Sequence, residues 1–326
     1  LRRQRQMCIR DSKSRMNLYQ ASIFSSLLFH LLLLLGMSPL LPGIIARTKA
    51  VIAGRQGPPL LQPYSDIRKL FRKSMVISRT TTWLFRAGPV VGFAVPLLAA
   101  MLVPFGAMPA PLSFTGDLVL FVYLLGLARF FTVLAAMDTG SSFEGMGAAR
   151  EATFSVLVEP TILVAFIVLA RSSNSLTLNT MLSAGAGGAL FSGPAAMSLI
   201  LISFCLFIVL LVENCRIPFD DPNTHLELTM IHEVMVLDHS GPDFALIQYG
   251  AAMKLLLSAV LVLDLILPSS GSMLLDGFAL VAGLIVLAVC IGLVESAMAR
   301  LRLIRIPQLL VGTTLLSFFA FILILR

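Results

Sequence analysis

Residues Ala195–Glu213 read AAMSLILISFCLFIVLLVE, an apolar run with no charged residue before its last position. A helix that crosses a bilayer needs about 20 predominantly apolar residues, whereas the strands of a membrane barrel are short segments of alternating polarity. This run is continuous and long enough. It therefore predicts a transmembrane α-helix, and it sets the class of the whole chain.

Apolar runs of the same kind recur along the chain with polar breaks between them. Only 13% of the residues are charged and 57% are hydrophobic, with a mean hydropathy of +0.92, whereas soluble domains carry roughly 25% charged residues. We expect an all-α integral membrane protein, a bundle of about eight helices, and no soluble enzyme. The expected spans are 17–45, 88–108, 116–136, 150–170, 195–213, 248–268, 275–298 and 306–325.

Lysine and arginine residues are distributed unequally between the two sides that these spans define. If the first span enters the membrane from outside, the outer side keeps only Arg171 and Arg326, apart from the first 15 residues. Cytoplasmic loops carry the excess of basic residues in membrane proteins. The distribution predicts that the two long loops, at about 46–87 and 214–247, are cytoplasmic.

The first 15 residues, LRRQRQMCIRDSKSR, contradict this distribution because they are basic on the outer side. They are not followed by the small-residue cleavage site of a signal peptide. We expect a non-native or disordered tail over 1–15, translation from Met16, and a single transmembrane domain over 16–326.

Several functional classes are excluded by the residues that their sites require. The net charge of +7 comes largely from the first 15 residues and from Arg47–Arg86, beside expected spans, where charge sets topology, so we expect no nucleic-acid partner. No two cysteines have metal-ligand spacing, and HEVMV at His232–Val236 lacks the second histidine of a zinc protease. We expect no catalytic residue, no metal site and no cofactor bound by this chain.

The first long loop contains GRQGPPLLQPYSDIRKLFRK, Gly54–Lys73. Gly57-Pro58-Pro59 predicts a rigid turn, after which Ser65 or Asp66 can cap a short helix. This helix would be strongly basic, so it could lie on anionic lipid or dock an acidic partner. Its basic residues are Arg68, Lys69, Arg72 and Lys73.

The second long loop contains ENCRIPFDDPNTHLELTMIHEVMVLDHSGPD, Glu213–Asp243. Its prolines, Pro218 and Pro222, predict an extended start. The capping box Thr224-x-x-Glu227 then predicts an amphipathic helix that ends at Gly241-Pro242. On this helix Glu227 and Asp238 would fall in the apolar arc, where a carboxylate is costly.

Charged residues also interrupt the expected spans. A charge at mid-bilayer costs roughly 2.5–3.5 kcal/mol. Glu151 and Glu159 would lie about 80° apart on one helix side and about 12 Å apart along it. Either these charges form structural pairs, such as Lys254 with Asp264, or together they form a route for protons or ions. The residues concerned are Arg129, Glu151, Glu159, Glu213, Lys254, Asp264 and Glu295.

Four separated motifs, in order, resemble the complex I membrane subunit 1 family. Its hydrogenase branch is the most similar, the membrane anchor (formate hydrogenlyase subunit 4 type) of group 4 nickel–iron hydrogenases. The resemblance runs from about Leu40 to Pro307. The motifs are GPPLLQPYSDIRKLFRK, DTGSSFEGMGAAREATFSVLVEP at Asp138–Pro160, ENCRIPFDDPNTHLELTMIHEVMVLDHSG and ESAMARLRL at Glu295–Leu303.

This resemblance implies eight helices in a prokaryotic cell (inner) membrane, and two loops that grip a soluble electron-transfer module. It implies coupling carboxylates at Glu151, Glu159, Glu213, Asp220, Glu227, Glu233 and Asp238, to which the span charges add Lys254 and Glu295. It implies a docking surface shaped by Gly57, Pro58, Gln62, Asp66 and Arg216, beside the basic helix.

The implied partners are the large and small hydrogenase subunits, an iron–sulfur subunit, antiporter-like membrane subunits and lipid. Nickel–iron and iron–sulfur sites would lie on those partners. Asp221-Pro222-Asn223-Thr224-His225 stands where quinone-using relatives carry a glutamate- and alanine-rich stretch, which argues against quinone reduction. We therefore expect a non-catalytic anchor that couples electron transfer to proton or sodium movement. The alternatives are the quinone-site subunit of a complex I-type oxidoreductase and a stand-alone secondary transporter.

The predicted topology is testable with reporter fusions. Reporters placed after residue 60 and after residue 230 should both report the cytoplasm, because both loops lie on the basic side of the membrane. A periplasmic signal from either fusion contradicts the assignment.

Overall fold

The computed structural model describes residues 24–183, 196–220, 230–268 and 272–325. The expected tail at 1–15 lies outside these ranges. The described residues form helices, with a single isolated β-bridge between Phe105 and Met108. Eight of these helices are long and apolar enough to span a membrane, which confirms the predicted class and number of spans.

The eight spans follow one another along the chain with short elements between them. The spans are Phe24–Ile52, whose second part is α2 (Leu40–Ile52), α4 (Trp83–Ala100), α5 (Asp117–Asp138), α6 (Ser142–Ser173), α9 (Ala196–Glu213), α10 (Gly241–Ile266), α11 (Met273–Ala297), and Leu303–Leu325, which contains α12 (Ile306–Leu325). The short elements are α3 (Gln62–Phe71), α7 (Leu178–Ser183), and the 3-10 turns η1 (Glu233–Val236) and η2 (Leu303–Arg305).

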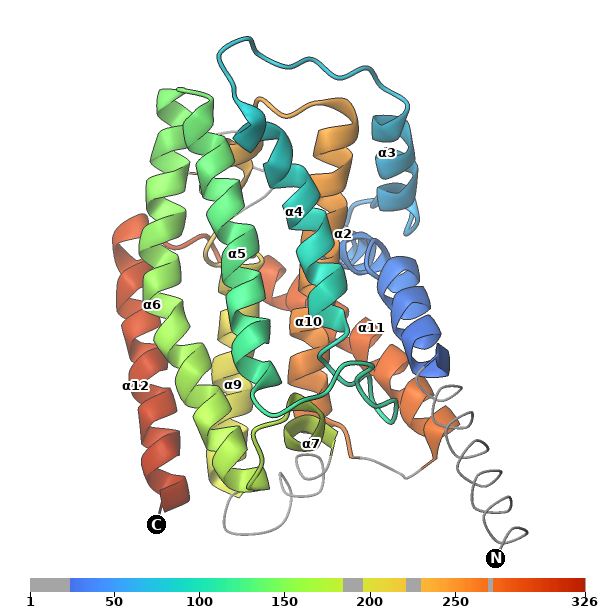
Figure 1. Cartoon of the computed structure of the whole chain (residues 1–326), viewed down its shortest axis with the longest axis vertical. Helices are drawn as coiled ribbons and strands as arrows, with labels where there is room; N and C mark the ends of the chain where they lie inside the picture. Colours follow the sequence, from blue (N-terminus) through green and yellow to red (C-terminus); the bar gives the residue numbers. More distant parts are fainter. Residues whose placement is uncertain (1–23, 184–195, 221–229, 269–271, 326) are drawn as a thin grey trace, which may run out of the picture.

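Both long loops lie at the same end of the bundle, at the top of Figure 1, near α3. We call this end the loop face. The opposite end, with α7 and the end of α12, is the distal face (Figure 1). This arrangement agrees with the topology predicted from the basic residues, in which the two long loops share one side.

Helix α10 forms the centre of the bundle. It contacts α2, α3, α4, α7, α9 and α11, while α6 packs against α5, α9 and α12 on one flank. Helices α4 and α10 approach closely enough that a Cβ at Gly250 would collide with the main-chain carbonyl of Gly92. Only glycine permits this approach, so Gly250 lets α10 occupy the central position.

The ends of several helices differ from the prediction. Helix α2 extends to Ile52 and α4 begins at Trp83, so the first loop is shorter than 46–87. Ser65 and Asp66 lie inside α3 rather than capping it, because α3 begins at Gln62 with Pro63 in its first turn. A proline is tolerated there because the first N–H groups of a helix have no partner within the helix.

The same principle corrects the second loop. Gly241-Pro242 was expected to end a helix, but these two residues form the first turn of α10, after Ser240. The expected amphipathic helix from Thr224 falls partly on 221–229, outside the described residues. From Met230 to Ser240 the chain contains only the 3-10 turn Glu233–Val236. Pro218 lies in a turn rather than in an extended segment.

Candidate functional site

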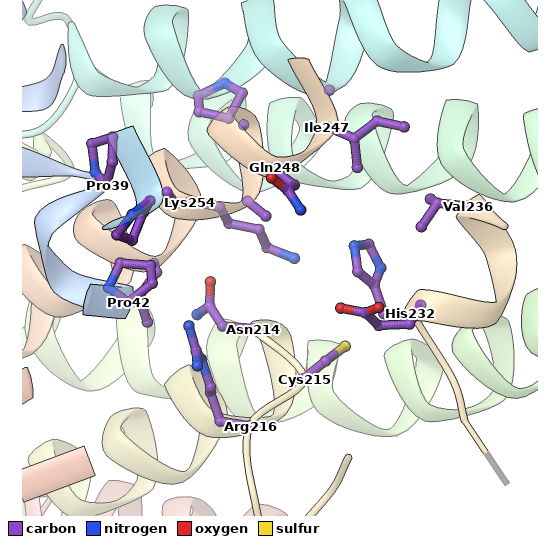
Figure 2. Close-up of a pocket in the computed structure, with 18 of the residues that line it drawn as sticks. Pro39, Pro42, Asn214, Cys215, Arg216, His232, Val236, Ile247, Gln248 and Lys254 are labelled. Carbon is purple, nitrogen blue, oxygen red and sulfur yellow. The ribbon is translucent and has the colours of Figure 1, made fainter. Parts of the chain in front are cut away.

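A cavity of about 510 Å³ lies near the loop face. Prolines of the first span and first loop form one wall, while α10 and the segments on either side of 221–229 form others. Figure 2 shows Gln248 and Lys254 of α10, and His232 of the second loop, directed towards the same space. The cavity therefore joins both long loops to the interior of the bundle.

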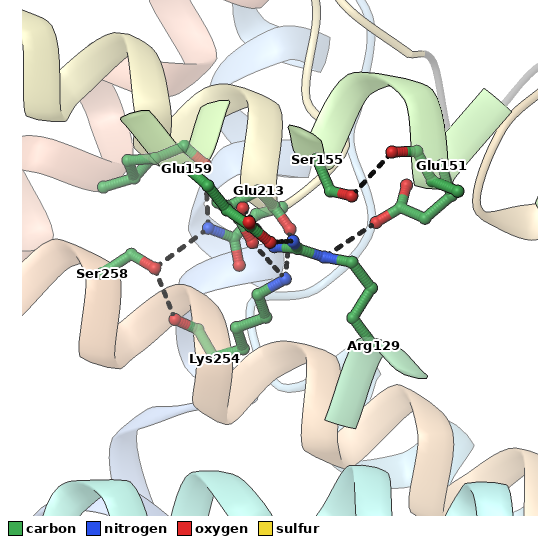
Figure 3. Close-up of polar contacts among 10 residues, drawn as sticks. Arg129, Glu151, Ser155, Glu159, Glu213, Lys254 and Ser258 are labelled. Carbon is green, nitrogen blue, oxygen red and sulfur yellow. Dashed lines mark hydrogen bonds and ion pairs between the residues drawn. The ribbon is translucent and has the colours of Figure 1, made fainter. Parts of the chain in front are cut away.

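One corner of the cavity is an ion-pair cluster centred on Arg129 of α5 (Figure 3). The Arg129 guanidinium lies 3.5 Å from a carboxylate oxygen of Glu151 and 3.2 Å from one of Glu159, both on α6. A third carboxylate, that of Glu213 at the end of α9, pairs with the same guanidinium. One arginine thus joins α5, α6 and α9.

Lys254 of α10 completes this cluster. Its Nζ lies 2.7 Å from Oε2 of Glu213 and donates to the main-chain oxygen of the same residue at 2.8 Å. Ser258, one turn further along α10, accepts a hydrogen bond from the amide of Asn214 at 3.3 Å. The cluster contains three carboxylates and only two cations, so it has one carboxylate more than it has cations. The carboxylates are those of Glu151, Glu159 and Glu213, and the cations are Arg129 and Lys254.

A second ion-pair group lies on another side of the same cavity. Glu295 of α11 has a side chain that is only 1% exposed. It lies 2.9 Å from Nζ of Lys49 in the first span and 3.6 Å from Nη1 of Arg216. A buried carboxylate is tolerated when it is paired in this way. Glu295 therefore connects the first span, α11 and the start of the second loop.

Asp220 holds together the two ends of the second loop. One oxygen lies 2.9 Å from Arg300, and the other accepts hydrogen bonds from the main-chain N–H of Ile231 at 2.9 Å and of His232 at 3.3 Å. Charge-assisted bonds of this kind are the stronger hydrogen bonds in proteins. The residues before and after 221–229 are thereby fixed to each other.

Most of the sequence-predicted coupling residues line this cavity. They are Glu151, Glu213, Asp220, Glu233, Lys254 and Glu295. Glu159 instead borders a smaller cavity of about 60 Å³ between α5, α6, α9 and α10, and its side chain is 50% exposed. Glu227 lies outside the described residues.

The placement of Asp238 on an apolar helix face was wrong. Asp238 is exposed, and it follows a 3-10 turn rather than belonging to an amphipathic α-helix. The structural alternative had supposed that Lys254 pairs with Asp264. Lys254 pairs instead with Glu213. Glu151 and Glu159 do share one side of α6, but an arginine joins them.

The predicted docking residues separate into two groups. Pro58, Gln62, Asp66 and Arg216 line the cavity, while the main chain at Gly57 packs closely against Ala50 of α2. The basic residues of the α3 segment are exposed at the loop face. These exposed residues are Arg68, Lys69, Arg72 and Lys73.

Sequence reasoning missed several residues at the cavity. Lys49 and Arg300 were treated only as topology signals, although each neutralises a buried carboxylate. Asn214 and His239 were not singled out, and both line the cavity. A histidine just before Gly-Pro carries no recognisable motif, so only the fold reveals its position.

Burial changes the protonation of three cavity residues outside the spans. Burial lowers the pKa of His232, and it raises the pKa of the Cys215 thiol well above its ordinary range. Burial also lowers the pKa of His239 to about 4. Cys215 is therefore a neutral thiol at pH 7, and both histidines are neutral.

No group of three or more histidine, cysteine, aspartate or glutamate side chains in the described ranges has the geometry to hold a metal ion. The polar groups around the cavity are instead arranged as ion pairs. Carboxylates in such an arrangement can take up and release protons.

Comparisons with known proteins identify similar chains. The NADH dehydrogenase family matches residues 24–325. Formate hydrogenlyase subunit 4 of Escherichia coli (strain K12) is 32% identical over 303 residues, covering 90% of this chain and 96% of that protein. Hydrogenase-4 component C of the same strain is 33% identical over 281 residues, covering 84% and 87%.

Two further proteins are similar at lower sequence identity. One subunit of the NADH-quinone oxidoreductase of Anaplasma phagocytophilum (strain HZ) is 27% identical over 261 residues, covering 70% of this chain and 74% of that protein. A chain of the membrane-bound sulfane sulfur reductase, an archaeal respiratory membrane complex, superposes with a TM-score of 0.79 at 20% identity. That superposition covers 93% of this chain and 99% of the other.

The depressed pKa of His239 predicts an acid-sensitive fold. The ring is buried against Phe85, with ring centroids 3.9 Å apart. An unfolded histidine takes up a proton below pH 6.5, while the folded one stays neutral down to about pH 4. Stability should therefore fall as the pH drops from 6.5 to 4, by at most about 1.4 kcal/mol per pH unit.

The replacement His239→Phe keeps the ring stacking and removes the titration. Thermal unfolding in detergent, compared between pH 7 and pH 5, should show a smaller acid-induced loss in the variant than in the wild type. Equal losses in both proteins would mean that His239 does not set the acid sensitivity.

Proposed function

Because the chain belongs to the NADH dehydrogenase family of complex I subunit 1-like membrane proteins, we propose that it is the anchor and coupling subunit of a complex I-like, energy-converting hydrogenase or formate hydrogenlyase. In this role it docks a soluble electron-transfer module at the loop face. It links that module to movement of protons or sodium ions across a prokaryotic inner membrane.

The cluster around Arg129 is the observation that carries this proposal. Three carboxylates face two cations between four membrane-spanning helices, so the cluster can accept one proton without leaving a buried cation unmatched. A buried ion pair is costly to break, but protonation of Glu159 removes only one of three pairs and leaves Arg129 matched by Glu151 and Glu213. The cluster borders a cavity that reaches both long loops, where a docked module would act.

The greater similarity to hydrogenase subunits supports protons, rather than quinone, as the electron acceptor of the complex. The two hydrogenase relatives are 32% and 33% identical to this chain, and the quinone oxidoreductase subunit is 27% identical. The proposed partners are hydrogenase large and small subunits, an iron–sulfur subunit and antiporter-like membrane subunits. In this proposal the nickel–iron and iron–sulfur groups belong to those partners, and this chain binds no cofactor.

A second candidate function is the quinone-site subunit of a complex I-type oxidoreductase. The cavity of about 510 Å³ favours it, because prolines and apolar side chains form much of the wall near the first span. The two functions differ in the module that co-purifies and in the acceptor that it reduces. Hydrogen evolution by the purified complex supports the hydrogenase, and quinone reduction without hydrogen evolution supports the alternative.

Docking is testable through the exposed basic residues of the α3 segment. The double replacement Arg72→Glu and Lys73→Glu should release the soluble subunits from membranes, most strongly at raised salt, because interactions of exposed charges are screened. Arg171→Glu, near the distal face, is the matched control and should leave co-purification unchanged. Retention of the soluble subunits by the double variant would leave lipid contact as the role of this helix.

Coupling is testable through Glu159→Gln, which preserves size and hydrogen bonding but removes titration. The excess carboxylate would then be lost, so ion translocation should fall while complex yield is retained. Both quantities should be measured on the same membranes. Normal translocation at normal yield removes Glu159 from the route, and a loss of yield assigns it a structural role beside Arg129.

A further inference from the structure

Asp264 lies at the other end of α10 from the cavity. Ten residues separate it from Lys254, a distance of about 15 Å along the helix, so it does not belong to the Arg129 cluster. Its residue exposure is only 8%. Neither the docking of a soluble module nor the ion-pair cluster uses this carboxylate.

Asp264 lacks the ion pairs that hold the carboxylates lining the cavity. Oδ1 accepts a hydrogen bond from the main-chain N–H of Gly106 at 3.3 Å, and Oδ2 has no hydrogen-bond partner among the described residues. No cation pairs with Asp264 in that part of the chain, whereas Glu151, Glu213 and Glu295 each have one. An ionised and unpaired carboxylate buried in this way is strongly disfavoured.

A capping role does not explain Asp264 either. It lies in the last turn of α10, where the helix dipole disfavours negative charge. Asp117 provides the contrast at the same end of the bundle. Its Oδ2 likewise has no hydrogen-bond partner among the described residues, and its Oδ1 accepts a hydrogen bond from the N–H of Leu178 at 2.7 Å. Asp117, however, lies in the first turn of α5, where the helix dipole favours negative charge.

The Asp264 carboxyl faces a buried turn, Val103–Gly106, which a second titratable side chain holds from the first span. The His30 ring stacks on Phe105, with centroids 4.3 Å apart. Its Nε2 lies 3.0 Å from the carbonyl oxygen of Val103, and its Nδ1 lies 2.7 Å from that of Ser26. A neutral imidazole has a proton on only one nitrogen, so both contacts are hydrogen bonds only when the ring is protonated.

Gly106 brings the turn close to both neighbouring helices. Its φ of +62° lies in the left-handed region, and a Cβ there would come within 3.3 Å of the main-chain oxygen of Asp276 on α11. A side chain at this position would therefore crowd the main chain of α11 and strain the left-handed backbone. The titratable groups around this turn are Asp264 on α10, Asp276 on α11 and His30 on the first span.

We propose that Asp264 is a proton-binding site near the distal face, at the turn that His30 holds from the other side. A bound proton neutralises a carboxylate that has no cation and lies at the negative end of its helix. This role rests on the proposed coupling function. In it, a translocated proton is taken up at the Arg129 cluster and leaves the bundle from Asp264, about half the membrane thickness away.

Two measurements on the assembled complex test this proposal. Infrared spectroscopy of wild type and of Asp264→Asn should show a protonated carboxyl group in the wild type that is lost in the variant. Asp117→Asn, the matched control, should retain it. On the same preparations, proton translocation into vesicles should fall by roughly 100-fold in Asp264→Asn, the lower range of what a positioned proton carrier contributes, with Asp264→Glu restoring both signals.

The outcomes separate this site from the proposed function. An ionised Asp264 in the infrared spectrum overturns the proposal directly. If Glu159→Gln impairs translocation and Asp264→Asn does not, the coupling function stands and the distal site is wrong. If neither variant affects translocation although Asp264 is protonated, neither carboxylate lies on the route and the role of Asp264 as an exit is wrong. If the wild-type complex itself translocates no protons, the coupling function fails.

Discussion

The guanidinium of Arg129 imposes the constraint on which the rest of the bundle depends. An arginine within a membrane span must be matched by carboxylates and hydrogen bonds, because water is absent there. Its partners come from α6 and α9, and one of them, Glu213, also pairs with Lys254 of the central helix α10. Four helices are therefore positioned by charge matching as well as by apolar contact, since apolar packing alone does not distinguish helix from lipid.

The second long loop connects this cluster to the loop face. The N–H of Asp238 donates to the Glu144 carboxylate at 3.1 Å, and Arg150 donates to the carbonyl oxygen of Met230 at 2.9 Å. At its other end, Ser240 exchanges hydrogen bonds with the main chain of Val76 in the first loop. The segment is therefore attached both to α6, which carries two of the cluster carboxylates, and to the loop that carries the exposed basic helix. A displacement of the exposed basic helix would act on α6 through these contacts.

The sequence predicts the number of spans well, because a bilayer requires long apolar runs that are visible without an alignment. It predicts helix ends less well, since Gly241-Pro242 is equally compatible with the end of one helix and the start of another. Within the site, the charges in apolar runs singled out Glu151, Glu213 and Lys254, and the structure places these three residues at the cavity. Their pairing was not predictable, because it depends on how α5, α9 and α10 pack. The predicted placement of Asp238 on an apolar helix face was wrong because a helical periodicity was assumed where the chain forms a 3-10 turn.

The central place of α10 has a consequence for biosynthesis. The ribosome delivers α5, α6 and α9 to the membrane before α10, so Arg129 can pair with Glu151 and Glu159 as soon as α6 follows α5. Glu213 then has Arg129 as its cation until Lys254 is synthesised. Helices α2 and α4 likewise lack one of their packing partners until α10, which contacts both, has been synthesised. The nascent chain therefore exposes an unfinished, acidic interior until its sixth span arrives.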